Sequence, residues 1–212
     1  MKKFLLTNWP IIILLFLAFL TRFWHLGVPA EVVFDEVHFG KFISAYFQHE
    51  FYFDIHPPLG KMMIAGFARI FSYEPASDFL QIGDSYDPLI LRFLPAFFGS
   101  LLVGLIYLLA RQTGITPKFA FFAGFLALFD NALLIQSRFI LLDIFLLFFG
   151  FAGIYIFLVS RACPKKQGRI IFAVLSAIFI GLSFSVKWTG LSFLALVFVV
   201  IFYDFIKIKN IK

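Results

Sequence analysis

The chain has 212 residues, of which 62% are hydrophobic and only 14% are charged, and its formal net charge is +6. With 34 phenylalanines it could not keep its apolar surface from water, so the composition excludes a soluble domain and indicates an all-α membrane protein. The basic residues are dispersed at the ends of apolar stretches and form no stripe, which excludes nucleic acid as a partner.

The sequence contains six apolar stretches that are each long enough to approach the width of a bilayer, at about 9–25, 88–110, 118–135, 139–160, 170–186 and 188–206. The first is expected to be retained, because no small-residue cleavage site follows it. Eleven of the eighteen basic residues fall at alternate ends of these spans. The positive-inside rule makes that side cytoplasmic, together with the N-terminus, and makes the loop at about 26–87 extracytoplasmic.

This loop is polar and has structure of its own. Nine of the twelve acidic residues of the chain lie between Glu31 and Asp87. Helical spacing predicts a short amphipathic helix in the interface, with an apolar face of Phe39, Phe42, Ile43, Tyr46 and Phe47. A second short helix is expected to begin at Pro58 and to run to about Phe71, since proline suits the first helical position.

Asp35 and Glu36 are adjacent acids at the start of the first short helix. On one interpretation Asp35 caps this helix by accepting hydrogen bonds from its free N–H groups, and Glu36 is stabilised by the helix dipole. On the other, Asp35 is a general base, a partly desolvated carboxylate whose pKa is free to rise beside the headgroups. One carboxylate can do both, with one oxygen capping and the other facing a substrate.

A second candidate group is the stretch from Asp54 to Pro58, in which two prolines hold His56 in extended geometry. In an extended segment Asp54 and His56 point the same way, because they are two residues apart. The plain alternative is a turn that leads into the next helix, with His56 only hydrogen-bonded. Together with His38 and Glu36 the spacing also suits a metal, but this ligand set has no recognisable signature, and we expect no divalent metal.

Three cations, Arg92, Arg138 and Lys187, lie at or near the outer ends of spans. A charge within a span costs about 2.5–3.5 kcal/mol on insertion scales, so it implies a partner or a function. A pair between Arg138 and Asp143, or snorkelling of the three side chains to the headgroups, would offset that cost. Alternatively the cations bind a lipid-linked phosphate, a role that suits the fork of arginine.

These motifs together resemble those of the protein O-mannosyltransferases. The first extramembrane loop carries two of them: Asp35-Glu36-Val37-His38-Phe39-Gly40-Lys41 and Phe53-Asp54-Ile55-His56-Pro57-Pro58-Leu59-Gly60-Lys61. Others follow in the order of the family: Leu91-Arg92-Phe93-Leu94-Pro95-Ala96, Gln136-Ser137-Arg138-Phe139-Ile140-Leu141-Leu142-Asp143, and Ser185-Val186-Lys187-Trp188-Thr189-Gly190-Leu191. The resemblance spans residues 9–195 or so.

The resemblance implies a transmembrane helical bundle of the GT-C glycosyltransferase type with short interfacial helices in its first loop. It implies inverting transfer of mannose from polyprenyl-phosphate-mannose to Ser or Thr hydroxyls of an acceptor polypeptide, on the extracytoplasmic face. No cofactor is implied beyond this lipid-linked donor, and a monophosphate donor does not demand a metal.

The resemblance also implies roles for the candidate residues. Asp35 matches the acid that deprotonates the acceptor hydroxyl, and Glu36 and Asp54 match acids that position the acceptor and the donor. Arg92 sits where a cation supports the leaving phosphate. His56, Arg138 and Lys187 lie in family motifs and are expected to bind substrate. Membrane lipids are expected to surround the protein.

Members of this family generally have about eleven spans, whereas six are found here. Residues 1–212 are therefore expected to form the N-terminal portion of a GT-C membrane domain without its C-terminal spans. Either a truncated product or one half of a split enzyme would fit, and in the second case another chain supplies the missing spans.

Two other functions remain open at this stage. One is a related GT-C transferase that glycosylates a lipid, such as one that adds aminoarabinose to lipid A. The other is a non-catalytic fragment or subunit that binds a partner half. The compact loops favour a multi-pass protein of a bacterial or archaeal cell membrane.

Overall fold

The computed structural model describes residues 2–209 except 75–78 and 80, and the regular secondary structure of this part of the chain is helical, with no strand. Its helices are α1 (Lys2–Phe23), α2 (Glu36–Gln48), α3 (Leu59–Ile70), α4 (Leu89–Gln112), α5 (Pro117–Phe129), α6 (Asn131–Gln136), α7 (Asp143–Ala162), α8 (Lys166–Val186), the 3-10 helix η1 (Trp188–Gly190) and α9 (Leu191–Lys209). The expected all-α class is therefore confirmed.

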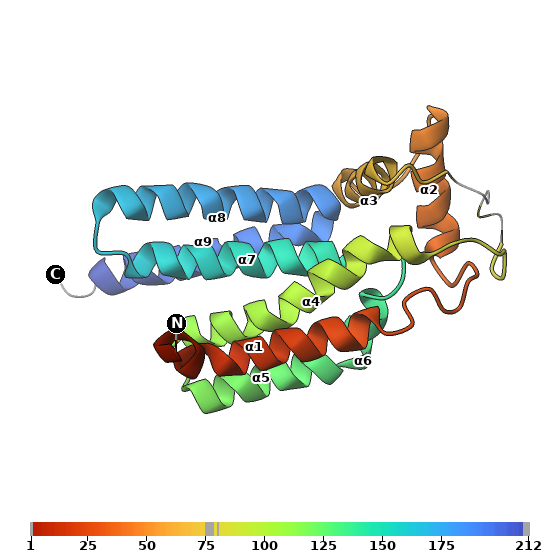
Figure 1. Ribbon diagram of the computed structural model, residues 1–212. Coiled ribbons are helices and arrows are strands. Elements are labelled where there is room, and N and C mark those ends of the chain that lie inside the picture. The colour runs from red at the N-terminus through yellow and green to blue at the C-terminus, as the bar shows by residue number, and fades with distance from the viewer. Residues whose placement is uncertain (1, 75–78, 80, 210–212) are drawn as a thin grey trace.

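Six of the helices run side by side, and Figure 1 shows that α1, α4, α5, α7, α8 and α9 share one long direction. α1 begins and α9 ends at the same end of this bundle, which we call the terminal end. α2 and α3 lie at the opposite end, which we call the loop end, and α2 stands across the bundle direction. The candidate residues of the first loop are thereby held at one end of the molecule.

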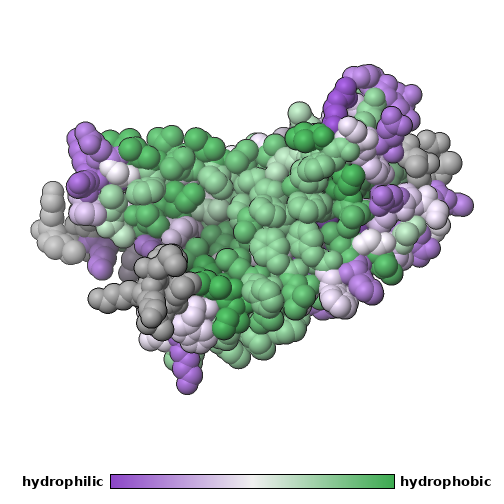
Figure 2. Space-filling view, in the orientation of Figure 1, coloured by the Kyte–Doolittle hydropathy of each residue, from purple (hydrophilic) through white to green (hydrophobic). Residues whose placement is uncertain are grey.

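The described residues contain four helices that are long and apolar enough to cross a membrane: Leu89–Gln112, Asp143–Ala162, Lys166–Val186 and Trp188–Lys207. Six spans were predicted, and the other two stretches form the shorter apolar helices Trp9–Phe23 and Pro117–Phe129. Figure 2 shows a broad hydrophobic band over the middle of the bundle, with hydrophilic surface at both ends. The chain is a multi-pass membrane protein in which two of the six predicted apolar stretches are short helices.

The predicted span at 118–135 is interrupted by Asp130. This residue has extended backbone geometry and ends α5, and its carboxylate accepts a hydrogen bond of 2.8 Å from the N–H of Leu133. That bond caps the short helix α6, which takes the second part of the predicted span. An aspartate that accepts a local N–H competes with helix continuation, and apolar content alone did not reveal it.

The predicted span at 139–160 begins four residues late, at Asp143. The preceding residues form turns, and the N–H of Ile140 donates a hydrogen bond of 3.0 Å to a carboxylate oxygen of Glu36. A backbone N–H that is satisfied from another part of the chain does not need a helix, so a distant acid sets where α7 starts.

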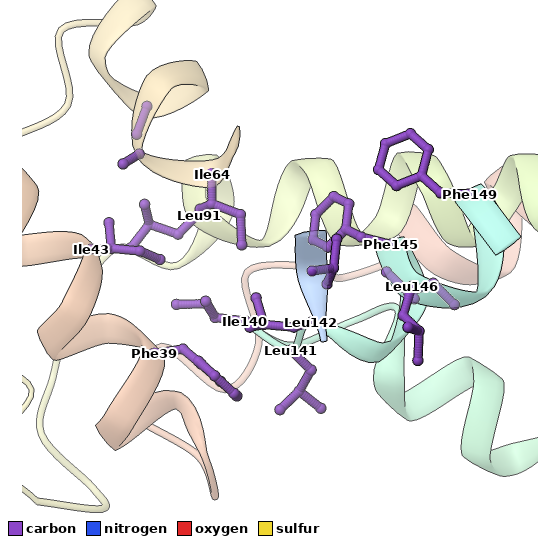
Figure 3. Packing of buried hydrophobic residues seen from close by; sticks show 14 of the residues in the cluster. Phe39, Ile43, Ile64, Leu91, Ile140, Leu141, Leu142, Phe145, Leu146 and Phe149 are labelled. Carbon is purple, nitrogen blue, oxygen red and sulfur yellow. The ribbon is translucent and has the colours of Figure 1, made fainter. Parts of the chain in front are cut away.

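The core of the loop end joins α2, α3, α4 and the start of α7, as Figure 3 shows. Its fully or almost fully buried members include Ile43, Ile64, Leu91, Ile140 and Phe145. Burial of one such side chain stabilises the fold by about 1.5–3 kcal/mol, so this cluster fixes both short helices against the bundle. The predicted helix at the apolar series from Phe39 to Phe47 is confirmed as α2, and the second short helix begins one residue later than predicted, at Leu59.

The outer end of α1 is divided between the interior and the surface. Trp24 is 65% exposed, as expected of an aromatic side chain at a membrane interface, whereas Arg22 is fully buried. A Cβ added at Gly99 of α4 would overlap Cβ of Ser137 and lie 3.3 Å from Nε of Arg22, so the glycine leaves room for both side chains. The end of α1 therefore places one side chain at the membrane interface and another inside the bundle.

Candidate active site

Four polar side chains from two segments line one cavity at the loop end. Asp35 and His38 come from the start of α2, and Asp54 and His56 come from the segment between α2 and α3. The cavity has a volume of about 240 Å³ and its apolar wall includes Phe39 and Phe42. The structure thus brings together the two acids that the sequence had singled out 19 residues apart.

Asp35 occupies the N-cap position of α2, but its side chain accepts no capping hydrogen bond. Its backbone carbonyl takes the helix-initiating bonds instead, from the N–H groups of His38 and Phe39 at 3.0 and 3.1 Å. The expectation that Asp35 caps α2 through its carboxylate is therefore wrong. The carboxylate is half-buried and lies on the wall of the cavity.

Glu36 is fully buried and its two carboxylate oxygens accept four hydrogen bonds. Arg92 donates two of them, at 2.8 and 2.7 Å, and the N–H groups of Val33 and Ile140 donate the others, both at 3.0 Å. These bonds use most of the acceptor capacity of a carboxylate. The geometry gives no support to direct contact between Glu36 and a substrate.

Arg92 is also fully buried and donates five hydrogen bonds within the protein. Besides the two to Glu36, these reach the carbonyls of Leu26, Pro29 and Glu31 at distances of 2.8–3.5 Å. A guanidinium has five N–H donors, so none is left for a phosphate. The geometry does not support the predicted contact between Arg92 and the leaving phosphate.

Asp54 is held by Lys61, the third residue of α3, in an ion pair whose side chains are 8% and 1% exposed. The other carboxylate oxygen of Asp54 accepts the backbone N–H of His56 at 3.2 Å. Burial raises the pKa of Asp54, but the hydrogen bonds from Lys61 and His56 and the charge of Lys61 outweigh it and leave this pKa below the usual 3.8. Asp54 and His56 face the same cavity, as the extended geometry predicted.

Lys61 was not among the residues predicted from the sequence to form the site. It ends the motif from Phe53 to Lys61, but an amphipathic helix in an interface normally carries its lysines on the solvated side. Its position in the helix gives no sign of burial. The one available signal was its place seven residues after Asp54, at the end of the same motif.

Arg138 lies at the end of α1 rather than beside Asp143. Its guanidinium donates to the carbonyls of Thr21, Arg22 and Trp24 at 3.0, 3.1 and 2.7 Å and to the carbonyl of His25 at 3.1 Å. Thr21 and Arg22 lie in the last turn of α1, where a helix leaves carbonyls unpaired, and Trp24 and His25 follow its last residue. Arg138 therefore caps the C-terminal end of α1 and the turn after it. The proposed pair between Arg138 and Asp143 does not form.

Lys187 takes the partner that had been expected for Arg138. Its ammonium donates to both oxygens of Asp143, each at 2.8 Å, and ties the end of α8 to the start of α7. The next residue, Trp188, is 58% exposed and its ring N–H donates to the carbonyl of Ile55 at 2.9 Å. This bond connects the end of the membrane helices to the Asp54–His56 segment.

A larger groove of about 570 Å³ opens on the other side of the same segment. Its lining comprises Asp54, Ile55, His56, Pro57, Pro58, Leu59, Met62, Phe184, Ser185 and Trp188. It is mostly apolar and lies where α3 meets the end of α8. Asp54 and His56 therefore stand between an acidic cavity and an apolar groove, which is an arrangement suited to a reactant that is polar at one end and lipidic at the other.

No group of three or more His, Cys, Asp or Glu side chains with metal-binding geometry occurs among the residues that the structure describes. His38, Asp54 and His56 share a cavity but do not form such a group. The prediction that the protein needs no divalent metal stays a prediction.

The helical bundle and the polar loop end define a membrane glycosyltransferase fold of the GT-C class. The solved Saccharomyces cerevisiae protein O-mannosyltransferase Pmt1–Pmt2 complex bound to the sugar donor superposes with a TM-score of 0.88 at 32% identity, covering 92% of this chain and 28% of that one. An Archaeoglobus fulgidus oligosaccharyltransferase shares the fold, with a TM-score of 0.71 at 16% identity, over 95% of this chain and 27% of that one.

Sequence comparison identifies the family within this class. A family model described as dolichyl-phosphate-mannose-protein mannosyltransferase matches residues 12–210. Protein O-mannosyltransferase 1 of Drosophila melanogaster is 38% identical over 87% of this chain and 21% of its own length. Dolichyl-phosphate-mannose–protein mannosyltransferase 4 of Schizosaccharomyces pombe is 36% identical over 89% of this chain and 25% of its own length.

The chain belongs to the dolichyl-phosphate-mannose-protein mannosyltransferase family. It spans about a quarter of the length of these curated relatives. The family resemblance that the motifs suggested is therefore confirmed for this part of the enzyme.

Proposed function

We propose that the protein transfers mannose from polyprenyl-phosphate-mannose to Ser or Thr hydroxyls of acceptor polypeptides, with inversion at the sugar. The observation that carries this proposal is the uncapped carboxylate of Asp35 on the wall of a cavity that it shares with Asp54 and His56. The names of the relatives specify a dolichyl-phosphate-mannose donor and protein acceptors, and the solved relative holds the sugar donor.

In this reaction the acceptor hydroxyl oxygen forms a bond to the anomeric carbon of mannose. The bond from that carbon to the phosphate oxygen breaks, and its electron pair leaves with the polyprenyl phosphate. Asp35 takes the hydroxyl proton as general base, because its carboxylate is in the cavity and has no capping bond to give up. Asp54 and His56, which line the same cavity, hold the sugar or the acceptor.

Glu36 and Arg92 hold this site rather than act on substrate, since their hydrogen bonds are all made within the protein. Lys187 keeps one ammonium N–H beyond the two that Asp143 accepts, and Arg138 keeps donors beyond its four bonds to carbonyls. These two residues stay the candidates for binding the phosphate, whose departing charge a cation stabilises.

The orientation follows from charge. Seven basic residues lie at the terminal end, within or next to the helix ends that the α4–α5 and α7–α8 connections join and near the end of α9: Arg111, Lys118, Arg161, Lys165, Lys166, Arg169 and Lys207. We place this end in the cytoplasm and the loop end on the extracytoplasmic face. The mannosyltransferases named above are from a fly and from yeasts and give no support to a bacterial or archaeal source.

We further infer that the chain works beside additional membrane helices. The solved relative is a complex of two mannosyltransferase chains. Most side chains of α8 and α9 face outward, so these helices offer apolar surface to further spans, to a second chain or to lipid. The relatives are about four times as long as the part matched here, so they have chain beyond it that could supply such helices.

The test is mannosyl transfer in membranes that contain the natural protein, from radiolabelled polyprenyl-phosphate-mannose to a Ser/Thr-rich peptide. The matched control is a peptide in which every Ser and Thr is Ala. Label in the first peptide alone supports the proposal. Label in lipid instead would establish the lipid-glycosylating alternative, and no transfer to either acceptor would indicate a non-catalytic subunit.

A further inference from the structure

Lys61 is an unusual residue for a short helix at a membrane surface, because its ammonium is inside the protein. Its side chain is 1% exposed, and it lies in the first turn of α3. A buried ammonium is costly unless it is paired and hydrogen-bonded. The site must therefore supply groups that are arranged around this cation.

Three kinds of group surround the ammonium. The carboxylate of Asp54 pairs with it, and the carbonyl of His56 accepts a hydrogen bond of 3.1 Å. The rings of Phe42 and Tyr52 lie with their centroids 5.2 and 5.7 Å from it. These two rings stack on each other at 4.6 Å, so α2 and the segment before α3 share one aromatic wall around the cation.

The consequence for the active site lies in what the cation holds. Lys61 binds the carboxylate of Asp54 and the backbone of His56, and Asp54 in turn accepts the N–H of His56. Both side chains are thereby fixed on the wall of the cavity that contains Asp35. Lys61 lines a neighbouring cavity, and it does not line the one with Asp35, so it does not contact a reactant placed there.

We propose that Lys61 is the positioning residue of this site: its ammonium pairs with Asp54 and holds the Asp54–His56 segment in the geometry that receives a reactant. This inference rests on the proposed function for the identity of that reactant. The arrangement of Lys61, Asp54 and His56 is independent of it.

Other ionisable groups also face Asp54 and enter the pH dependence of any reaction here. They come from α2 and its cap, from the segment before α3 and from α3 itself: Asp35, His38, Tyr46, Glu50, Tyr52, His56 and Lys61. As the general base, Asp35 gives the pH profile of transfer an acid limb of its own. A variant of Asp54 is therefore needed to separate the effect of Lys61 on Asp54 from the titration of Asp35.

The experiment compares the pH dependence of kcat/KM for transfer in the natural protein and in Lys61→Met. Without the ammonium, the carboxylate of Asp54 stays buried, loses its cationic partner and keeps Asp35 and Glu50 nearby, so it binds a proton at higher pH and the acid limb moves up by about one unit or more. Lys61→Arg keeps the charge and is expected to keep the limb in place. The matched control is Lys118→Met, which removes an exposed lysine at the terminal end.

Lys61→Met in an Asp54→Asn background is expected to leave the acid limb of kcat/KM where Asp54→Asn alone places it. A uniform loss of activity at every pH, with the acid limb unmoved, would overturn the proposal and leave Lys61 a structural residue only. A shift of equal size in the Asp54→Asn background would also overturn it, because the effect would not pass through Asp54.

A second readout does not require activity. Thermal unfolding of the natural protein, Lys61→Met, Asp54→Asn and the double variant forms a cycle. The proposal expects Lys61→Met to lower the midpoint strongly, or to abolish folding, and to cost much less when Asp54 is already Asn; additive effects would overturn it. If the natural protein transfers no mannose, the proposed function fails while this cycle still decides the role of Lys61.

Discussion

At the scale of single residues, two adjacent carboxylates have opposite environments. Glu36 is fully buried and accepts four hydrogen bonds, whereas Asp35 accepts no capping bond and lines a cavity. The difference follows from the direction of the two side chains at the start of α2, where neighbouring positions are about 100° apart. One acid is thus fixed as part of the framework and the other stays available for chemistry.

Replacing Asp35 by Asn is expected to lower mannosyl transfer by about 10²–10⁴-fold, because an amide cannot take the acceptor proton. Binding of the donor lipid should persist, since nothing in the fold depends on this carboxylate. Transfer and donor binding are measured on the same membranes. Glu31→Gln, an exposed acid whose backbone alone contacts Arg92, is the matched control, and near-native turnover of Asp35→Asn would remove Asp35 from the role.

The depressed pKa of Asp54 predicts how stability depends on pH. A carboxyl group with a lowered folded-state pKa contributes stability above its unfolded value, and this is lost as the pH falls through the folded value. The difference in unfolding free energy between the natural protein and Asp54→Asn should therefore be constant above about pH 5 and should shrink in acid. Unfolding in detergent at a series of pH values measures it, and a difference that grew on acidification would contradict the assignment.

At the scale of elements, one buried ion pair joins four segments. Glu36 opens α2 and Arg92 lies in the first turn of α4, and their hydrogen bonds extend to the chain before α2 and to the turns before α7. The ring of Phe139 also lies 4.8 Å from the Arg92 guanidinium. This pair therefore sets how the first loop sits on the bundle.

Arg92→Met is expected to destabilise the fold by about 3–5 kcal/mol, because it leaves Glu36 buried without its partner. The double variant Glu36→Gln/Arg92→Met should be destabilised by less than the sum of the single variants. Chemical unfolding in detergent gives these values, with donor binding measured alongside. If Arg92→Met kept the native stability but weakened donor binding, the role of Arg92 would instead be to bind the phosphate of the donor.

The cap that Arg138 places on α1 gives a second prediction for elements. Arg138→Ala removes four hydrogen bonds, two to carbonyls in the last turn of α1 and two to carbonyls in the turn after it, and should cost about 1–3 kcal/mol. The loss should be local, so amide hydrogen exchange is expected to accelerate at residues 22–28 and to change little in α8. Exchange that is unchanged at the end of α1 would show that these bonds do not hold it.

At the scale of the whole molecule, the helices approach closely where glycines face large apolar side chains. A Cβ added at Gly150 of α7 would overlap the ring of Phe193 in α9, and one at Gly153 would lie 2.6 Å from Cγ1 of Ile180 in α8. The α7–α8 and α7–α9 contacts therefore depend on glycines in the middle of an apolar helix. Such contacts let helix backbones approach each other within a membrane.

Gly150→Ala is expected to destabilise the bundle by about 1–3 kcal/mol through overpacking against Phe193. Gly181→Ala is the matched control, since a Cβ at this position of α8 meets nothing within 4 Å and alanine favours a helix. Thermal unfolding of the two variants in detergent should separate them by several degrees. Equal midpoints would mean that α9 shifts to make room.

Some features were predictable because they depend on local order. The period of apolar residues gave α2, and the proline before Leu59 gave the start of α3 to within one residue. The acids of the first loop marked the site, and extended geometry placed Asp54 and His56 on one wall. Hydropathy missed the break at Asp130, because one local hydrogen bond ended the helix.

The sequence by itself determined the class of the molecule, the number of apolar stretches and the family, because composition, period and ordered motifs are properties of the chain. Only the tertiary structure decided which charged residues keep donors or acceptors that a substrate could use. Glu36, Arg92 and Arg138 bond to groups that are distant in the sequence, with partners more than 100 residues away for Arg138. These partners cannot be identified from the local sequence. A charged group whose donors or acceptors are all used within the protein cannot form hydrogen bonds with a substrate.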